Sequence, residues 1–457
     1  MNIMPPRATL VERAIEALRR LPIGELTARE HVRTVRSTVA VAGESELLRF
    51  FRLLDALGAD DAAVDREIER ARDADAAHRR PAMGRLRRAL EPARDHVLRH
   101  LAAPPGDLRF VVELRAALRT LSASRSDAAD LASLDDELRT FLAGRLDAGV
   151  LELRRLTWSD SAALLERLAR SEAVHAVRGW FDLKDRLDDD RRVYAFFHPA
   201  LPGTPLAFTE VALTDDLPSS IRAILNKDAA RTDPASARNA TFYSISNCEP
   251  GLTGIPFGNA LIKHAVEELR RDFPRLRTFA TLSPLPGFAA WVRSLGERAP
   301  EPVRTGLAKP AWHRDGGASS VLREPLLRLA ARYLLDAKRA DAAPCDAVER
   351  FHMANGAMIE RLNWLGDTTQ RGLEQSFGIM VNYRYALDRY PANQLAYAAH
   401  HALDASPAVR ALAMSDTTRI DDDAPAATLS RRAAFSAAIR NVTDHARKML
   451  TRTAAGA

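Results

Sequence analysis

Hydrophobic residues recur with the period of an α-helix through the first part of the chain. Only seven of the 25 prolines precede Ala176, so few helix breakers interrupt this pattern. The apolar stripes consist of Leu47, Leu48, Phe51, Leu54 and Leu57, and of Leu164, Leu165, Leu168 and Ala169. The second stripe follows Ser159-Asp160-Ser161, which is a typical helix start. Because such stripes usually form packed cores, the pattern predicts a helical bundle over residues 1–175 and no chemistry within it.

The pattern changes after Val177, where short runs of β-branched and aromatic residues alternate with turn residues. The runs Tyr194–Phe197 and Leu206–Leu213 predict two neighbouring strands, joined by a proline- and glycine-containing turn at residues 201–205. Amphipathic helices are expected between such strands. The part of the chain after residue 175 is therefore expected to form a second domain, which mixes strands and helices.

A glycine-rich turn lies between a strand and a helix in residues 240–284. Thr241–Ser246 predicts a strand, Asn259–Phe273 a helix, and Leu276–Leu282 a further strand that ends at Ser283. The turn contains Gly251, Gly254 and Gly258. Backbone N–H groups and the positive end of the helix dipole converge at such a junction, which suits a pyrophosphate.

The spacing of these glycines limits the choice of ligand. An ordinary tight connection contains similar glycines, so the three residues are weak evidence on their own. The spacing matches neither a Walker loop nor the dinucleotide-binding pattern. It resembles the acyl-CoA loop of GNAT acetyltransferases, which favours coenzyme A. Gly258, at the junction of loop and helix, is then expected to let the pyrophosphate approach the backbone closely.

Helical periodicity returns towards the C-terminus. One apolar stripe consists of Leu326, Leu329, Ala330, Tyr333 and Leu334. A second helix is expected from Asp346 through Trp364. Beyond Leu403 the chain contains the acidic run Asp421–Asp423 and ends without a peroxisomal tripeptide. We expect part of this tail to be exposed or disordered.

Composition and charge narrow the class of protein. The 457 residues are 46% hydrophobic and 28% charged, which is typical of globular proteins, and the length favours two domains. We expect a cytoplasmic protein with no membrane partner, because the sequence has neither a membrane-spanning apolar run nor a signal peptide. The net charge of +6 comes from arginines interleaved with acidic residues, which argues against a nucleic-acid partner. Cys248 and Cys345 are too few for a disulfide framework or a cysteine-rich zinc site.

Three long motifs carry a resemblance to a known family. The first is FFHPALPGTPLAFTEVALT, residues 196–214. The second is the pair FYSISNCEPGLTGIPFGNALIK, residues 242–263, and FATLSPLPGFAAWV, residues 279–292. The third is FHMANGAMIERLNWLGD, residues 351–367, followed by GIMVNYRYALD, residues 378–388. In content and order these motifs resemble those of malonyl-CoA decarboxylases, lyases of malonate and fatty acid metabolism that convert malonyl-CoA to acetyl-CoA and carbon dioxide.

The resemblance implies a fold and a set of site residues. It implies an α+β fold in which an all-α helical bundle, residues 1–175, precedes a GNAT-like mixed α/β catalytic domain with C-terminal helices, residues 176–457. It places the catalytic serine at Ser283, the catalytic histidine at His352 and a site tyrosine at Tyr385. The acyl-CoA-binding segment falls on Gly254, Ile255, Pro256, Phe257, Gly258, Asn259 and Ala260. The pair Pro256-Phe257 departs from the family pattern, because some members carry an acidic residue there.

The chemistry of decarboxylation explains why these residue types are needed. Loss of carbon dioxide leaves electrons that spread onto the thioester oxygen as an enolate, so the site needs hydrogen-bond donors for this oxygen and an acid that protonates C2. Ser283 is expected to bind the malonyl group or to act as a proton acceptor, and His352 to donate the proton, because its ordinary pKa lies near neutral pH. The thioester is already an electron sink, and the sequence has no HExxH, no clustered His/Cys ligands and no cofactor-lysine motif. We therefore expect no metal and no cofactor.

Each of these residues also has an ordinary structural interpretation. A lone Ser-Pro commonly satisfies strand-end backbone, and a lone helical histidine is commonly packed, so the surrounding motifs carry the functional interpretation. Asn355, one helical turn after His352, is expected to contact the substrate and to orient the imidazole, and Tyr385 to supply a further donor. His198 and Asn363 also lie in the motifs, but a buried polar role is an equally good interpretation for them.

Two other functions stay open at this point. A GNAT-type acyltransferase would bind acyl-CoA at the same loop and pass the acyl group to an amine, but the sequence nominates neither an acceptor channel nor a base. A catalytically silent acyl-CoA-sensing protein is disfavoured by the presence of Ser283 and His352. The family resemblance also implies a homo-oligomer, a tetramer or dimer. The sequence alone does not determine the oligomeric state, the regulation or the tolerance for methylmalonyl-CoA.

Overall fold

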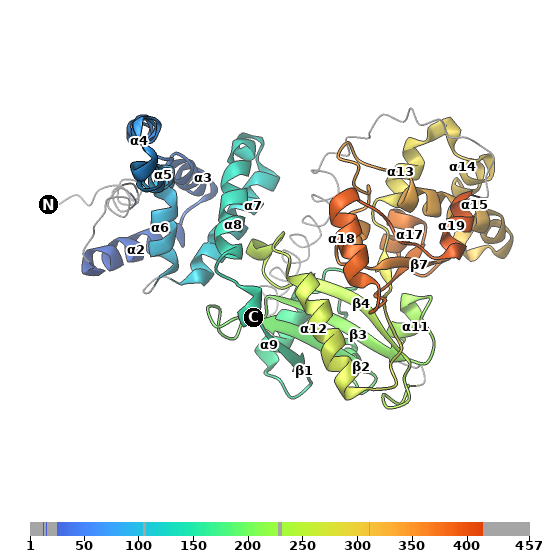
Figure 1. Cartoon of the computed structure of the whole chain (residues 1–457). Helices are drawn as coiled ribbons and strands as arrows, with labels where there is room; N and C mark the ends of the chain where they lie inside the picture. Colours follow the sequence, from blue (N-terminus) through green and yellow to red (C-terminus); the bar gives the residue numbers. More distant parts are fainter. Residues whose placement is uncertain are drawn as a thin grey trace. The chain divides into compact units, whose positions relative to one another are not determined.

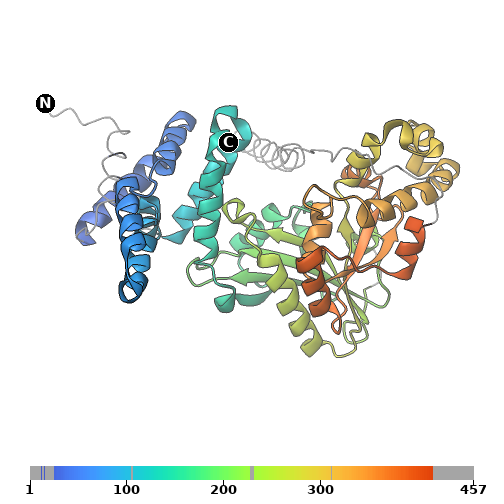
Figure 2. The same ribbon diagram turned by 45° about the horizontal axis from the view of Figure 1, so that its top comes forward.

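The computed structural model describes most of the chain (Figures 1 and 2). It describes residues 25–103, 107–226, 231–309 and 311–414, together with Glu12 and Ile15. The acidic run Asp421–Asp423 and the rest of the tail that we expected to be exposed lie outside the described residues.

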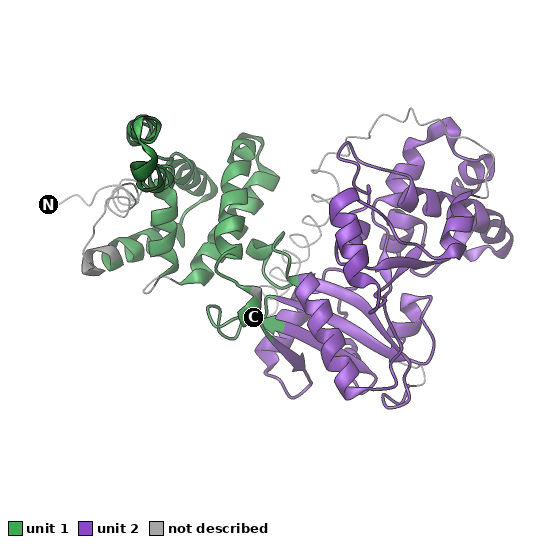
Figure 3. Ribbon diagram, in the orientation of Figure 1, with its two compact units in different colours: residues 1–152, 196–206, 247–257 green, residues 153–195, 207–246, 258–457 purple. Residues whose placement is uncertain are grey.

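The chain divides into two compact units (Figure 3). Unit 1 consists of Met1–Glu152, Phe196–Leu206 and Asn247–Phe257. Unit 2 consists of Leu153–Ala195, Ala207–Ser246 and Gly258–Ala457. The boundary expected between residues 175 and 176 stays a prediction about independently folding domains.

Unit 1 is built from helices, as its periodicity predicts. Its helices are α2 (Glu25–Val39), α3 (Glu44–Asp55), α4 (Asp61–Asp73), α5 (Ala76–Ala89), α6 (Ala93–Ala102), α7 (Leu108–Ser124) and α8 (Ala132–Ala143), with the 3-10 turns η1 (Ser126–Leu131), η2 (Ala148–Val150) and η3 (Pro250–Leu252). Asp60, Asp75 and Asp107 begin three of these helices, since each carboxylate accepts a hydrogen bond from a first-turn N–H. The apolar stripe of α3 forms core as expected, with Phe51 and Leu54 fully buried.

One mixed sheet organises the rest of the chain. Its strand order is β1-β2-β3-β4-β5-β8-β6, and β7 also pairs with β8. The strands are β1 (Glu152–Leu156), β2 (Arg191–Phe197), β3 (Ala207–Thr214), β4 (Asn239–Asn247), β5 (Thr278–Thr281), β6 (Ser283–Pro284), β7 (Met358–Asn363) and β8 (Met380–Arg384). The two neighbouring strands expected from the runs at 194–197 and 206–213 are confirmed as β2 and β3, and both are buried along almost their whole length.

Helices pack around this sheet in unit 2. They are α9 (Ala162–Ser171), α10 (Trp180–Arg186), α11 (Ile221–Leu225), α12 (Phe257–Asp272), α13 (Phe288–Ser294), α14 (Glu301–Leu307), α15 (Gly316–Leu335), α16 (Ala347–Ala354), α17 (Gln370–Ser376), α18 (Tyr390–His400) and α19 (Pro407–Met414), with the 3-10 turns η4 (Gly296–Arg298) and η5 (Trp312–Arg314). Helix α12 lies across strands β3 and β4 (Figures 1 and 2). Its predicted apolar face is buried and consists of Leu261, Ile262, Ala265, Val266 and Leu269. The strand, loop, helix and strand expected in residues 240–284 are thus confirmed.

Strands β4 and β5 run parallel and then separate. Residues 239–242 pair in register with residues 278–281, and the N–H of Leu282 donates to the carbonyl of Phe242. Beyond this point Ser283 and Pro284 pair with β8 instead, while β4 continues to Asn247. Ser283 therefore lies where the sheet opens.

Two expectations about secondary structure are wrong. Residues 1–175 are not wholly helical, because Glu152–Leu156 forms β1 at one end of the strand order. The helix expected from Asp346 through Trp364 ends at Ala354, because Gly356 takes a left-handed conformation with φ +78° and the chain continues as β7. In both segments, pairing with a neighbouring strand overrides the helical preference of the residue types.

The expected fold class is confirmed. A helical N-terminal part precedes a mixed α/β sheet with further helices towards the C-terminus. In the part of the chain that the structure describes, no helix has the length and apolar character needed to cross a membrane.

Candidate active site

Ser283 is buried at the start of β6, two residues after β5 ends at Thr281. Its hydroxyl donates a hydrogen bond to Thr281 Oγ1 at 2.8 Å, and its Oγ lies 3.1 Å from His352 Nε2. Residues two apart on an extended chain share a face, which explains why the two hydroxyls meet. The fold thus brings together Ser283 and His352, which are 69 residues apart in the sequence.

His352 is held in one orientation on α16. The Asp346 carboxylate begins this helix by accepting hydrogen bonds from two first-turn N–H groups. The buried imidazole stacks on the Tyr383 ring, with 4.5 Å between centroids and 26° between planes. Its Nδ1 lies 2.8 Å from the hydroxyl oxygen of Tyr385. Contacts at both ring nitrogens and on one face fix the ring.

Burial keeps this imidazole neutral. It lowers the pKa of His352 to about 3, well below the ordinary value near neutral pH from which its role as proton donor is predicted. A neutral imidazole has one N–H and one acceptor nitrogen. Since Ser283 donates to Thr281, the consistent arrangement has Tyr385 donating to Nδ1 and Nε2–H donating to Ser283 Oγ. The hydrogen bonds then run in one direction, from Tyr385 through His352 and Ser283 to Thr281.

Because His352 is neutral in the folded protein, the stability of the protein should depend on pH. Below pH 6.5 the unfolded chain binds a proton at His352, whereas the folded chain binds it only near pH 3. The free energy of unfolding therefore falls with falling pH, by up to about 1.4 kcal/mol per pH unit from this residue. We expect the destabilisation caused by His352→Gln, relative to wild type, to decrease accordingly between pH 6.5 and 5. Urea unfolding at both pH values measures this, with the exposed His78→Gln as control. A difference that does not change with pH would contradict a neutral buried imidazole.

Tyr385 joins the same site from the end of β8. Its backbone N–H donates to the carbonyl of Phe279 in β5 at 2.8 Å, which ties the residue to the sheet. Burial raises the pKa of the Tyr385 hydroxyl, so the side chain is a neutral donor. The structure therefore places Ser283, His352 and Tyr385 in one hydrogen-bonded chain, while their catalytic roles stay predictions.

The glycine loop leads directly into the first turn of α12. Gly254 has φ +83°, a conformation that favours glycine. Of the three residues that follow, Ile255 and Phe257 are buried and Pro256 is exposed. The helix begins at Phe257, ahead of its expected start at Asn259. Gly258, Asn259 and Ala260 therefore belong to its first turn, where N–H groups lack intrahelical acceptors and suit an anion.

Gly258 also packs directly against α16. A Cβ at this residue would lie 2.8 Å from Cζ and 2.9 Å from Cε2 of Phe351. Gly258 lies within the helix and is not among the residues with positive φ. The expectation that it is needed for close approach of a pyrophosphate therefore has a competing explanation: the missing side chain makes room for Phe351, the neighbour of His352.

Asn355 does not hold the imidazole. Both ring nitrogens of His352 are bonded to Ser283 and Tyr385, so the expectation that Asn355 orients the ring is wrong. Asn355 is buried, and its Nδ2 has no hydrogen-bond partner among the described residues. A buried unpaired donor is costly, and an enolate oxygen needs donors of this kind. Its contact with substrate stays a prediction, with the amide as the group that makes it.

Asn363 and His198, for which the sequence favours a buried polar role as much as a functional one, have different surroundings. Asn363 donates to Asn382 Oδ1 at 2.8 Å, and Asn382 donates to the carbonyl of Thr281 at 2.8 Å. Asn363 thus supports the strand end that carries Ser283. His198 Nδ1 accepts from the N–H of Ala200, whereas its Nε2 has no partner in the described part of the chain.

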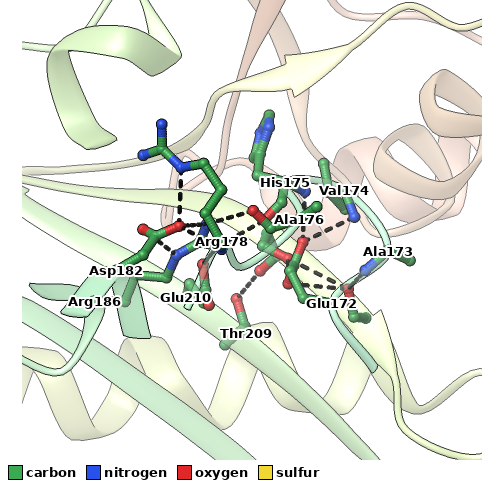
Figure 4. A network of polar contacts seen from close by, with 12 residues as sticks. Glu172, Ala173, Val174, His175, Ala176, Arg178, Asp182, Arg186, Thr209 and Glu210 are labelled. Atoms are coloured by element: carbon green, nitrogen blue, oxygen red, sulfur yellow. Dashed lines mark hydrogen bonds and ion pairs between the residues drawn. The ribbon is translucent and has the colours of Figure 1, made fainter. Parts of the chain in front are cut away.

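A buried polar network holds the segment after α9 against β3 and β4 (Figure 4). The Glu172 carboxylate accepts a hydrogen bond from the Ser244 hydroxyl at 2.5 Å and from the N–H of His175 at 2.7 Å. Arg186 donates to the carbonyl of His175 at 2.8 Å and pairs with Glu210 at 3.1 Å. The network steadies β4, the strand that leads into the glycine loop. Sequence reasoning missed it, because its members are ordinary residues spread over several elements.

The described residues contain no group of three or more His, Cys, Asp or Glu side chains placed to hold a metal ion. Both cysteines, Cys248 and Cys345, are free thiols.

Comparison with known proteins identifies the family. The family model for the malonyl-CoA decarboxylase C-terminal domain matches residues 149–423, more than half of the chain, and the model for the N-terminal domain matches residues 57–144. The chain belongs to the malonyl-CoA decarboxylase family. The C-terminal match contains Ser283, His352, Tyr385 and the whole glycine loop.

Individual members of the malonyl-CoA decarboxylase family align with most of the chain. The mitochondrial malonyl-CoA decarboxylase of Anser anser anser is 36% identical over 355 residues, which are 71% of this chain and 70% of the relative. That of Rattus norvegicus is 33% identical over 357 residues, 72% of each chain. Family membership makes this protein an enzyme of the carboxy-lyase class.

Solved structures agree with this assignment. The crystal structure of malonyl-CoA decarboxylase from Rhodopseudomonas palustris matches with a TM-score of 0.81 at 38% identity and covers 89% of this chain and 100% of that one. The enzyme from Agrobacterium vitis matches with a TM-score of 0.81 at 37% identity and covers 89% and 99%. The match supports the fold of helical N-terminal part and mixed α/β domain along nearly all of the chain.

Proposed function

We propose that this protein converts malonyl-CoA to acetyl-CoA and carbon dioxide. The observation that carries the proposal is the buried chain of hydrogen bonds from Tyr385 through His352 to Ser283, at the point where β4 and β5 separate. The helix that carries His352 also touches the first turn of α12 through Phe351 and Gly258. The candidate acid, His352, is therefore carried by a helix that packs against the helix turn suited to the pyrophosphate of coenzyme A.

The first step breaks the bond between C2 and the carboxylate carbon. The electron pair moves onto C2 and the thioester oxygen as carbon dioxide leaves, so the substrate's own thioester is the electron sink. The Asn355 amide is a neutral donor for the developing oxyanion, and so is the Ser283 hydroxyl once it turns from Thr281 towards the substrate. A neutral His352 forms no ion pair with the malonyl carboxylate, so it does not stabilise the ground state that must lose this charge.

The second step delivers one proton to C2. His352 Nε2–H supplies it, directly or through the Ser283 hydroxyl to which it is hydrogen-bonded. Tyr385 passes a proton to Nδ1 as Nε2–H is released, solvent restores Tyr385, and the imidazole returns to the Nε2–H tautomer before the next turnover. One proton is consumed in each turnover, as conversion of a carboxylate to carbon dioxide and a C–H bond requires.

Malonyl-CoA supplied without an acceptor separates this function from its alternatives. A decarboxylase forms acetyl-CoA and carbon dioxide from malonyl-CoA alone. A GNAT-type acyltransferase forms product only when an amine is added. An acyl-CoA-sensing protein binds the thioester without turning it over. Absence of acetyl-CoA in the first assay would overturn the proposal.

We expect EDTA-treated protein, free of biotin and pyridoxal phosphate, to keep its full decarboxylation rate. The reason is chemical: the thioester delocalises the carbanion that a cofactor would otherwise have to stabilise. Release of carbon dioxide before and after chelation measures the rate, with EDTA removed by gel filtration as the control. Activity that returns only when a metal ion is added would contradict the proposed mechanism.

Two finer statements complete the proposal. The family resemblance supports a homo-oligomer, a tetramer or dimer, which light scattering on purified protein tests. We also propose a cytoplasmic location, on the basis of the sequence. The vertebrate relatives are named mitochondrial, so fractionation of the native cell is the test that matters.

A further inference from the structure

Arg115 is a buried arginine whose guanidinium is hydrogen-bonded to the first half of the glycine loop. It lies on α7 and is 1% exposed. Its Nη1 donates to the carbonyl oxygens of Gly251 at 2.7 Å and Thr253 at 2.8 Å. Its Nε and Nη2 donate to the Asp135 carboxylate at 2.9 Å and 3.3 Å. Asp135 thus fixes one side of the planar guanidinium, and the other side holds two loop carbonyls.

Gly251 brings the loop into contact with the same helix. A Cβ at this residue would lie 2.0 Å from the carbonyl oxygen of Val112, so no side chain fits there. Val112 lies one turn before Arg115 on α7, and the two residues therefore share a helix face. The loop is held at this face by a close backbone approach and by two charge-assisted hydrogen bonds.

These hydrogen bonds also set the direction of the loop's N–H groups. In a trans peptide the C=O and N–H bonds point in opposite directions. Because the Thr253 carbonyl points at Arg115, the N–H of Gly254 points away from it. Gly254 then turns the chain with φ +83° towards the start of α12. Arg115 therefore fixes the orientation of the peptide groups that directly precede the segment suited to a pyrophosphate.

We propose that Arg115 is a positioning residue for coenzyme A, which fixes the loop in the orientation that binds the substrate's phosphates. This inference rests on the proposed function, which assigns the loop to acyl-CoA. Arg115 acts through the loop and does not touch the substrate, because the side chain is enclosed and four of its five N–H groups bind Asp135, Gly251 and Thr253.

The test is Arg115→Lys, assayed with two substrates. Lysine keeps the positive charge but loses the fork that holds Asp135 and two carbonyls together. We expect the KM for malonyl-CoA and the Kd for free coenzyme A to rise about tenfold, with kcat within about twofold of wild type. Malonyl-pantetheine lacks the pyrophosphate and adenosine, so its kcat/KM should change by less than about twofold.

Arg94→Lys is the matched control. Arg94 is another buried arginine of the helical part, and it binds Asp55 and Glu137 without contacting the loop. We expect this variant to lower Tm as Arg115→Lys does, but to leave the KM for malonyl-CoA unchanged. If Arg115→Lys does not fold, Asp135→Asn replaces it, because it loosens the same guanidinium while keeping the arginine, and its KM should rise by a smaller factor.

An unchanged KM and Kd in a folded variant would overturn the inference. Equal losses with malonyl-CoA and malonyl-pantetheine would also overturn it, because they would show a general structural defect. Failure of the proposed function has a different signature: wild-type protein that does not decarboxylate malonyl-CoA. In that case calorimetry with coenzyme A still compares wild type and Arg115→Lys.

Discussion

His352→Gln is expected to lower the turnover of malonyl-CoA by about 10²- to 10⁴-fold, the range typical of lost general acid catalysis. In the structure His352 connects Ser283 at 3.1 Å with Tyr385 at 2.8 Å. A glutamine amide can make hydrogen bonds in this position, but it cannot take up a proton on one side and release one on the other. Steady-state kinetics together with calorimetric binding of coenzyme A measure the two quantities, and the affinity should be preserved.

The lowered pKa of His352 changes the pH dependence that accompanies this variant. With a pKa of about 3, the imidazole does not change charge between pH 5 and 8 in the free enzyme. The pH profile of kcat/KM should therefore show no ionisation of His352 over this range, in wild type or in His352→Gln. Near-wild-type turnover of the variant would remove histidine as the acid and leave Tyr385 or water in its place.

The part of the fold that holds the site was accessible to sequence reasoning, because its signals are local. The β-branched and aromatic residues of β4, the glycines in the loop and the one-sided apolar face of α12 each belong to a single short segment. The same reasoning failed at β7. Met358–Asn363 contains helix-tolerant residues, and only its pairing with β8 makes it a strand. Pairing partners that lie outside a segment are invisible to its own periodicity.

The candidate site likewise contains features that could be predicted from the sequence and features that could not. Ser283, His352 and Tyr385 were nominated by long motifs, and the structure brings them within hydrogen-bonding distance. The neutral state of His352 could not be predicted, because it results from burial under elements that are distant in the sequence. The hydrogen bond from Arg115 to Gly251 joins residues that are 136 apart in the sequence, and no sequence pattern links the two.

Ser283 and His352 are expected to act as one unit. The Ser283 hydroxyl is bonded to both His352 and Thr281, so its removal takes away an oxyanion donor and also frees Nε2 of the imidazole. We expect Ser283→Ala to lower malonyl-CoA turnover by about 10²- to 10³-fold, as loss of one oxyanion donor typically does. Binding of acetyl-CoA and free coenzyme A should be nearly unchanged, because we assign the phosphate contacts to the loop and α12. Thr281→Val is the matched control: it keeps Ser283 and removes the hydroxyl that accepts from Ser283 and from the N–H of Tyr383, so it should have a much smaller effect.

The double variant Ser283→Ala/His352→Gln decides whether these two residues share one transition state. If the proton passes along the 3.1 Å contact between them, either single change already breaks the path, and the second change removes little more. The combined loss should then be smaller than the product of the two single losses. Turnover of all four proteins, measured at saturating malonyl-CoA, gives the coupling directly. Strictly multiplicative losses would show that serine and histidine act independently, with Ser283 holding the malonyl group and His352 reaching C2 by itself.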